Sequence, residues 1–399
     1  MDKFNWLLLS RATRSVGIMF VTVSSSLYLS ALGLPPALIG LVFLGMTAYI
    51  AGFSLGLGML GDRVGYKKSL ILGDLIPALG LALLVSTRDL LIVIPSMIVT
   101  GLGGTAGGAR GAFSPGLTAI VARNWRGEEE RVEKMGKLTS VAALSGMGGG
   151  LLLAFHDYLP FGNLNDYRFL FGVASLLLLA SSLFVLRVEE KRGEKKSTRF
   201  MKRSSLNYIS KVIASNVLSG AGIGLAIPLL PLWFSLRFHA TPLVIGITFS
   251  LASVSTALGS YLATLTKGSP LKLASMTRII NGVLLMGMAL SPFLVLASVL
   301  YIVRGLNAGL GMPNRTAVNV RGISEEDFGT ASSLQGVATR LSQTSSGLSG
   351  YIMEFGVDLP LEIGGFVQLL GGITYFALLR GGQGGSKPRE MRQQSDSKL

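Results

Sequence analysis

Two polar residues interrupt an apolar run near residues 293–313. Arg304 lies about ten residues into the run and Asn307 follows three positions later, so their side chains share one face of a helix. A guanidinium in such surroundings needs water, an anion or another acceptor, because leaving it unpaired costs at least about 2.5 kcal/mol. The pair could bind an anionic ligand, or it could bond to carbonyl groups of a neighbouring helix. The residues alone favour neither alternative.

Further polar residues within apolar runs extend this set of candidate ligand contacts: Arg340, Asn216, Tyr28 and Arg14. Arg14 shares a face with Arg11 near the start of its run, where a long side chain can also extend outward to water, and we expect this snorkelling for Arg11. Asn216 precedes Gly220 and Gly224 at successive steps of four residues, a spacing that also permits close helix packing.

Carboxylates are placed differently from these arginines. Asp74 is expected near the start of its run, close enough to the surface to pair with Lys68 or another cation, and Glu354 and Glu362 fall at the ends of theirs. A cationic ligand usually requires a buried carboxylate, whereas arginines in apolar surroundings suit an anion. The distribution therefore favours an anionic or neutral polar ligand.

Catalysis and metal binding lack their usual residues. Cysteine is absent, and the two histidines, His156 and His239, stand without other ligands at metal-binding spacing. The sequence has no GxxxxGK[ST] motif for binding nucleotide phosphates. We expect neither an enzyme nor a cofactor. The net charge of +15 does not predict a nucleic-acid partner, because most basic residues lie in short loops between apolar runs.

The elements that must position these residues are membrane-spanning helices. Of the 399 residues, 49% are hydrophobic and 14% are charged, and an apolar run of roughly 20 residues spans a bilayer. Six runs precede and six follow the polar stretch 187–206. They fall near residues 6–32, 37–58, 69–86, 90–112, 135–155, 167–186, 207–234, 242–264, 271–289, 293–313, 328–353 and 360–380.

This pattern predicts an all-α integral membrane protein of twelve helices in two halves. The predicted units are an N-terminal six-helix half (1–186), a linker (187–206), a C-terminal six-helix half (207–380) and a tail (381–399). The halves also look related, because Ile98-Val-Thr-Gly-Leu-Gly in the fourth run aligns with Ile302-Val-Arg-Gly-Leu-Asn in the tenth.

Basic residues set the expected orientation. Alternate loops on one side carry 25 Lys and Arg residues, whereas the loops on the other side carry Arg88, Arg168 and Arg237. Loops rich in Lys and Arg stay in the cytoplasm. We therefore expect a multi-pass protein of the cell membrane with both termini, the linker and the tail in the cytoplasm.

The loop after the second run has a distinctive pattern. It reads GMLGDRVGYKKSL from Gly58 to Leu70. Gly58 would let neighbouring helices approach, Gly65 would allow a tight reversal, and the basic residues would anchor to lipid headgroups: Arg63, Lys67 and Lys68. Asp62 is the candidate switch residue; alternatively, Asp62 and Arg63 form a turn whose charges only set topology.

This loop resembles the signature of the major facilitator superfamily, G-x-L-x-D-R-x-G-R-K-x-x-L, from which Tyr66 departs. The resemblance implies that the loop gates movement between the two halves, with Asp62 beside the eleventh helix. Arg110, near the inner end of the fourth helix, could hold Asp62 across the bundle. The resemblance also implies that helices 1, 4, 7 and 10 line a central cavity. Three of these helices are the runs that carry Arg14, Asn216 and Arg304.

The function expected from the resemblance is secondary active or facilitative transport of a small solute by alternating access. The substrate is expected to be anionic or neutral and polar. One alternative is multidrug efflux by drug/proton antiport, although the family's fifth-helix motif lacks its proline near Gly146–Gly150. Another is a non-transporting sensor or scaffold. The expected partners are a small-molecule substrate, membrane lipids and, if transport is coupled, a proton or another ion; the chain is expected to be a monomer.

Overall fold

The computed structural model describes residues 3–102, 116–117, 120–121, 124–125, 128–190, 203–266, 268–321, 323 and 328–380. Throughout these ranges the secondary structure is helical and contains no strand. The first half comprises α1 (Lys3–Ala31), α2 (Pro36–Val64), α3 (Tyr66–Ser86), α4 (Leu90–Thr100), α6 (Glu128–Ala154), η1 (Phe155–Tyr158) and α7 (Asn163–Leu186).

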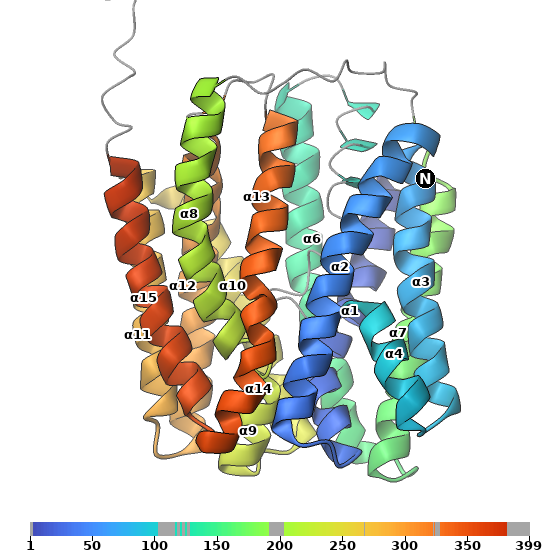
Figure 1. Cartoon of the computed structure of the whole chain (residues 1–399). Helices are drawn as coiled ribbons and strands as arrows, with labels where there is room; N and C mark the ends of the chain where they lie inside the picture. Colours follow the sequence, from blue (N-terminus) through green and yellow to red (C-terminus); the bar gives the residue numbers. More distant parts are fainter. Residues whose placement is uncertain are drawn as a thin grey trace, which may run out of the picture.

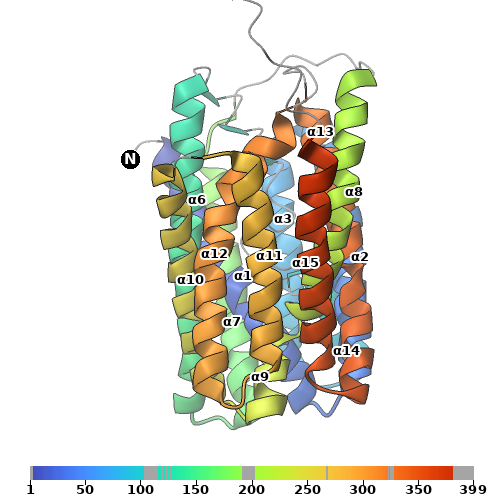
Figure 2. The ribbon, with the colours of Figure 1, turned by 90° about the vertical axis from the view of Figure 1, so that its left-hand side faces the viewer.

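The second half comprises α8 (Arg203–Ala226), α9 (Leu230–Phe238), α10 (Pro242–Leu265), α11 (Pro270–Ala289), α12 (Leu294–Val320), α13 (Phe328–Ser342), η3 (Gln343–Ser345), α14 (Ser346–Phe355) and α15 (Leu359–Arg380). In Figure 1 this half stands on the left, and Figure 2 shows α10, α12, α11 and α15 side by side.

Ten segments in the described ranges are long and apolar enough to cross a membrane. The fourth predicted helix is represented by the shorter apolar α4, and the eleventh by α13, η3 and α14 in succession. The prediction of twelve helices in two halves is therefore confirmed. The linker and tail boundaries stay predictions, because residues 191–202 and 381–399 lie outside the described ranges.

Local sequence fixes where several helices begin. Proline occupies the first position of α2, α10 and α11, where its missing N–H costs no helical hydrogen bond. Gly65 separates α2 from α3 with φ at 110°, a backbone conformation that side chains with a Cβ rarely adopt. The expected tight reversal at Gly65 is thus present.

The two ends of the bundle differ, and we name them by their connections. The linker end is the upper end in Figure 1, where α1 begins, α15 ends and α7 leads into the linker. The far end is the opposite one, where α2 begins and α14 ends. By the predicted topology, the linker end faces the cytoplasm.

The halves meet through glycines toward the far end. A Cβ built on Gly150 of α6 would lie 2.6 Å from the carbonyl oxygen of Gly246 in α10. A Cβ on Gly40 of α2 would lie 2.9 Å from the carbonyl oxygen of Gly347 in α14. Helices can approach this closely only where side chains are absent.

Carboxylates reinforce the same end. Asp157 Oδ2 accepts a hydrogen bond from the Leu243 N–H at 3.2 Å, and Glu354 Oε1 accepts one from the Ala37 N–H at 3.3 Å. Each carboxylate lies at the first turn of a helix in the opposite half, where the helix dipole favours a negative charge. The two halves supply one such contact each, in keeping with their relatedness.

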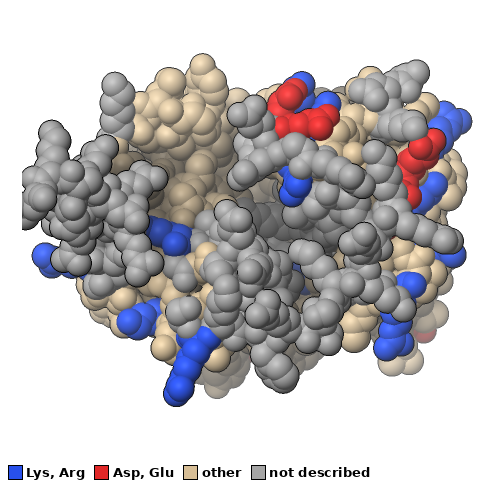
Figure 3. All heavy atoms as spheres, turned by 90° about the horizontal axis from the view of Figure 1, so that it is seen from above, with Lys and Arg blue, Asp and Glu red and all other residues tan. Residues whose placement is uncertain are grey.

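Toward the linker end the halves separate. α14 lies against α2, whereas the upper ends of α13 and α2 diverge in Figure 1. Between α13 and α2, Arg340 Nη1 donates to the Ile50 carbonyl oxygen at 3.4 Å, near the middle of α2. Seen from the linker end, the surface is hollowed, and Lys and Arg are more widespread on it than Asp and Glu (Figure 3).

We predict that Gly150→Ala destabilises the closed far end. The added methyl group would meet the Gly246 carbonyl, and overpacking of this kind costs about 1–3 kcal/mol. Because the chain has no cysteine, one cysteine placed at Ala37 can report far-end opening through its rate of thiol labelling. That rate should rise in Gly150→Ala.

The matched control is Gly146→Ala in the same helix, where an added Cβ meets nothing within 4 Å. This variant should leave labelling unchanged and stabilise α6 slightly. Equal labelling rates in the two variants would contradict the packing role of Gly150.

Candidate functional site

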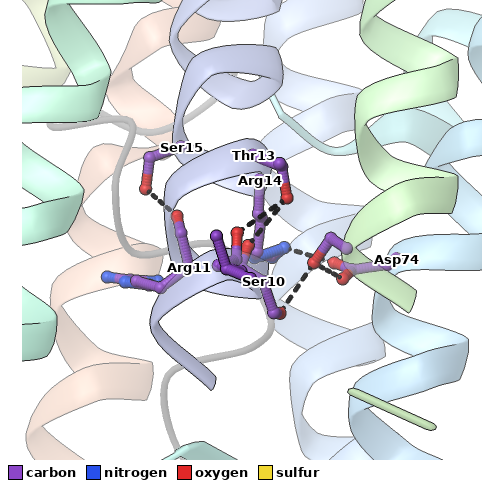
Figure 4. A network of polar contacts seen from close by, with 8 residues as sticks. Ser10, Arg11, Thr13, Arg14, Ser15 and Asp74 are labelled. Atoms are coloured by element: carbon purple, nitrogen blue, oxygen red, sulfur yellow. Dashed lines mark hydrogen bonds and ion pairs between the residues drawn. The ribbon is translucent and has the colours of Figure 1, made fainter. Parts of the chain in front are cut away.

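A buried ion pair joins the first and third helices of the first half (Figure 4). Arg14 Nη1 of α1 lies 2.6 Å from Asp74 Oδ1 of α3, and both side chains are at most 1% exposed. Ser181 Oγ of α7 donates to Asp74 Oδ2 at 2.6 Å, and Ser10 Oγ lies 2.9 Å from Ser181 Oγ. The pair is thus held by hydrogen bonds from a third helix, as a buried charge requires.

This arrangement corrects two expectations. Asp74 is fully buried rather than near the surface, although it does pair with a cation, which is Arg14. Arg11 is also buried, at 7% exposure, so it does not extend to the surface as snorkelling would require. Its side chain points away from Asp74 in Figure 4.

The second half contains a related contact with different charges. Arg278 Nη2 of α11 donates to Asn216 Oδ1 of α8 at 2.5 Å. The Arg278 Cζ lies 3.8 Å from the centroid of the Tyr375 ring in α15, within the range of a cation–π interaction. Arg278 is 4% exposed, and its Nε and Nη1 have no hydrogen-bond partner among the described residues.

The predicted pair on α12 divides between two roles. Asn307 is buried, and its Nδ2 donates to the Thr277 carbonyl at 2.7 Å and to Asn281 Oδ1 at 3.0 Å. Asn307 therefore fixes α12 against α11. Arg304 is partly exposed as a residue, and its Nε is buried without a hydrogen-bond partner in the described part of the chain. Its Cζ lies 5.9 Å from the Tyr301 ring centroid.

Two other predicted ligand contacts lie elsewhere in the bundle. Tyr28 is fully buried and packs against Phe171 and Tyr167 of α7, with ring centroids 5.1 and 6.0 Å apart. Arg340 reaches from α13 to the Ile50 carbonyl of α2 and so bridges the halves. The structure does not gather the six predicted residues into one pocket; it distributes them between the halves and their interface.

The signature loop connects α2 to α3 at the linker end. Arg63 and Lys68 are exposed, whereas Lys67 is half-buried. An added Cβ on Gly58 would meet nothing within 4 Å among the described residues, so Gly58 makes no close helix contact in this arrangement, and its expected role stays a prediction. The Asp62 side chain and the whole of Arg110 lie outside the described part of the chain, and their predicted pairing stays a prediction.

Glu190 makes the contact at this loop that the sequence interpretation missed. Its Oε1 accepts from the Tyr66 N–H at 2.9 Å and its Oε2 from the Lys67 N–H at 2.8 Å. A carboxylate at these positions satisfies the free donors of the α3 N-terminus and suits its dipole. The signal in the sequence was an acid at the end of a helix, but the region had been interpreted only as linker.

Arg278 is the second residue that the sequence interpretation missed. The family resemblance assigns helices 1, 4, 7 and 10 to the cavity. Arg278 lies on α11, the ninth helix, and therefore outside that set. A usable signal existed in the spacing of Arg278 and Asn281, which matches that of Arg304 and Asn307. Among the described residues no group of three His, Asp or Glu could hold a metal ion.

Comparison with known proteins supports the fold and the signature loop together. Residues 7–217 match the family described as the Major Facilitator Superfamily, and the chain belongs to this family. It is therefore a multi-pass membrane protein of a family of solute transporters, and the family indicates transport rather than catalysis.

Particular relatives are more distant. A segment of 213 residues is 26% identical to the synaptic vesicular amine transporter of Bos taurus, covering 51% of this chain and 38% of that protein. The match thus spans well under two thirds of the relative.

Several solved structures share the overall arrangement. An auto-inhibited POT-family peptide transporter has a TM-score of 0.78 at 11% identity, covering 98% of this chain and 99% of that chain. A D-xylose–proton symporter has a TM-score of 0.73 at 13% identity, covering 93% and 96%. At these identities the likeness shows the fold alone.

We predict that Asp74→Asn strongly destabilises the protein. The substitution leaves the Arg14 guanidinium buried without its carboxylate, and removing one partner of a buried ion pair costs about 3–5 kcal/mol. Thermal denaturation of the purified protein in detergent measures the effect. Glu362→Gln removes the same charge from a far-end position and should change the unfolding temperature little; equal losses in both variants would contradict this role of the pair.

Proposed function

We propose that this protein is a secondary active or facilitative transporter that moves a small anionic or neutral polar solute by alternating access. The observation that carries the proposal is Arg304, a partly exposed residue near the middle of α12 whose buried Nε has no hydrogen-bond partner among the described residues. Since a charge at this depth requires compensation, a substrate with a negative or strongly hydrogen-bonding group suits it.

The positions and partners of the carboxylates support the same substrate class. Asp74 is fully buried but is already paired with Arg14, so it offers no free negative charge. Glu354 and Glu362 lie at the far end. Within the described spans, a lipophilic cation would find no unpaired mid-span carboxylate, whereas an anion would find Arg304.

The packing of the halves supports an alternating-access mechanism. Glycine contacts and two carboxylate–helix contacts join the halves at the far end, while the linker end diverges. With the predicted topology this is an inward-facing state. Transport would require the far-end contacts to separate as the linker ends come together.

The signature loop would act during that closure. Gly58, Asp62, Arg63, Gly65, Lys67 and Lys68 belong to the segment that joins α2 to α3 at the linker end. In the open arrangement a Cβ added to Gly58 would meet no described residue within 4 Å, so this position is available for a contact formed only on closure. Arg340 lies between this region and the far-end contacts and would move with them.

A second candidate is transport of an amine or cationic drug in exchange for protons. The partial similarity to a vesicular amine transporter favours it. It requires a carboxylate that is free to bind a cation or a proton, and Asp74 could serve only if Arg14 moved away. The two candidates therefore make opposite predictions for Arg304.

We predict that Arg304→Gln weakens binding and transport of an organic anion by about tenfold or more. A hydrogen bond to a charged group contributes about 1.5–3 kcal/mol, and a factor of ten in affinity corresponds to about 1.4 kcal/mol. A thermal-shift screen of organic anions, sugars, amino acids and lipophilic cations identifies a ligand, and proteoliposomes measure its flux.

Arg237→Gln, at the far end, is the matched control and should bind the anion normally. Stabilisation and flux with cations alone, unchanged in Arg304→Gln, would contradict the proposed substrate class and favour amine transport. Binding without flux would contradict transport and favour a sensor.

A further inference from the structure

A long stretch of the second half carries buried positive charge and contains no acidic residue. From Arg203 to Ile323 the sequence contains no Asp or Glu. Arg278 nevertheless lies within this half at 4% exposure. Its position is about two helical turns beyond Pro270, the first residue of α11. A buried guanidinium in a membrane-spanning bundle needs a counter-charge or a full set of acceptors.

The first half shows how this chain solves the same problem. An offset of 204 residues aligns Ile98 with Ile302 and also aligns Asp74 with Arg278; Arg14 and Asn216 are 202 residues apart. Both pairs join the first helix of a half to the third, α1 to α3 and α8 to α11. The contacts are therefore related by the internal repeat.

The charges at the two related positions differ. In the first half Arg14 and Asp74 form an ion pair of zero net charge. In the second half the partner of Arg278 is Asn216, whose Oδ1 accepts one hydrogen bond at 2.5 Å but carries no charge. Among the residues that the structure describes, the second contact therefore retains one uncompensated positive charge.

The remaining surroundings of Arg278 do not supply the missing charge. Tyr375 covers one face of the guanidinium with its ring at 3.8 Å, and Arg315 of α12 is close enough to add repulsion. Arg278 Nε and Nη1 are buried donors without an acceptor. Within the described residues no carboxylate pairs with this group.

We infer that a small inorganic anion binds at Arg278 and takes the place that a carboxylate holds in the first half. Chloride fits this role because it needs no directional bonding and little space, whereas the near-complete burial of Arg278 excludes a large organic solute. The anion is a counter-ion for the helix bundle and is distinct from the solute proposed at Arg304.

The test compares the unfolding temperature of the purified full-length protein in sodium chloride and in sodium gluconate at a constant ionic strength of about 0.15 M. A ligand stabilises the state that binds it, so the wild type should unfold several degrees higher in chloride. Asn216→Asp supplies the missing carboxylate in nearly the same volume. This variant should lose the difference between the salts and unfold in gluconate at least as high as the wild type does in chloride.

Three further variants test whether the anion binds at Arg278. Arg278→Gln should also lose the chloride effect, whereas Arg304→Gln should keep it. Asn165→Asp introduces the same change of charge at the far end and should keep it too. Equal unfolding temperatures of the wild type in both salts would overturn the inference, as would a chloride effect that persists in Arg278→Gln or in Asn216→Asp.

Discussion

The cost of placing a charge in an apolar interior organises this molecule more than any other single constraint. Arg14 meets it with Asp74, and the pair draws α1, α3 and α7 together through Ser10 and Ser181. Arg278 meets it only in part, through Asn216 and the face of Tyr375. Each half is thereby fixed around a buried cation, and the difference in how that cation is neutralised distinguishes two halves that share an architecture.

The interface between the halves is formed by contacts of another kind than the charged groups inside each half. The backbones of Gly150 and Gly246 lie against each other, as do those of Gly40 and Gly347, and single carboxylates lie at helix N-termini. Contacts of this kind depend on close approach rather than on interlocking side chains. The interiors of the halves are held by the Arg14–Asp74 ion pair, the Arg278–Asn216 contact and packed aromatic rings. The described contacts of the seam are of the glycine and carboxylate kinds, so the seam is where relative motion costs least.

The sequence predicted the fold well because hydrophobic length, basic loops and one loop motif are local signals. The predicted runs correspond to the helices of the described part of the chain, and Gly65 made the reversal that its position implied. The site was harder to predict, because burial and partnership depend on neighbours distant in sequence. Asp74 looked peripheral by its position along α3 yet is fully buried, and Arg278 gained importance only once Asn216 and Tyr375 were known to surround it. Glu190 could not be assigned from a linker's composition.

The glycine contact between α2 and α14 also has a mechanical consequence. Gly40 lies near the beginning of α2, and the helix continues to Val64, a length of about 36 Å at 1.5 Å per residue. With the fulcrum so close to one end, α2 acts as a lever: a rotation of roughly ten degrees would move its other end by about 6 Å over that length. A small rotation of α2 at its contact with α14 would thus produce a much larger movement at the linker end of α2.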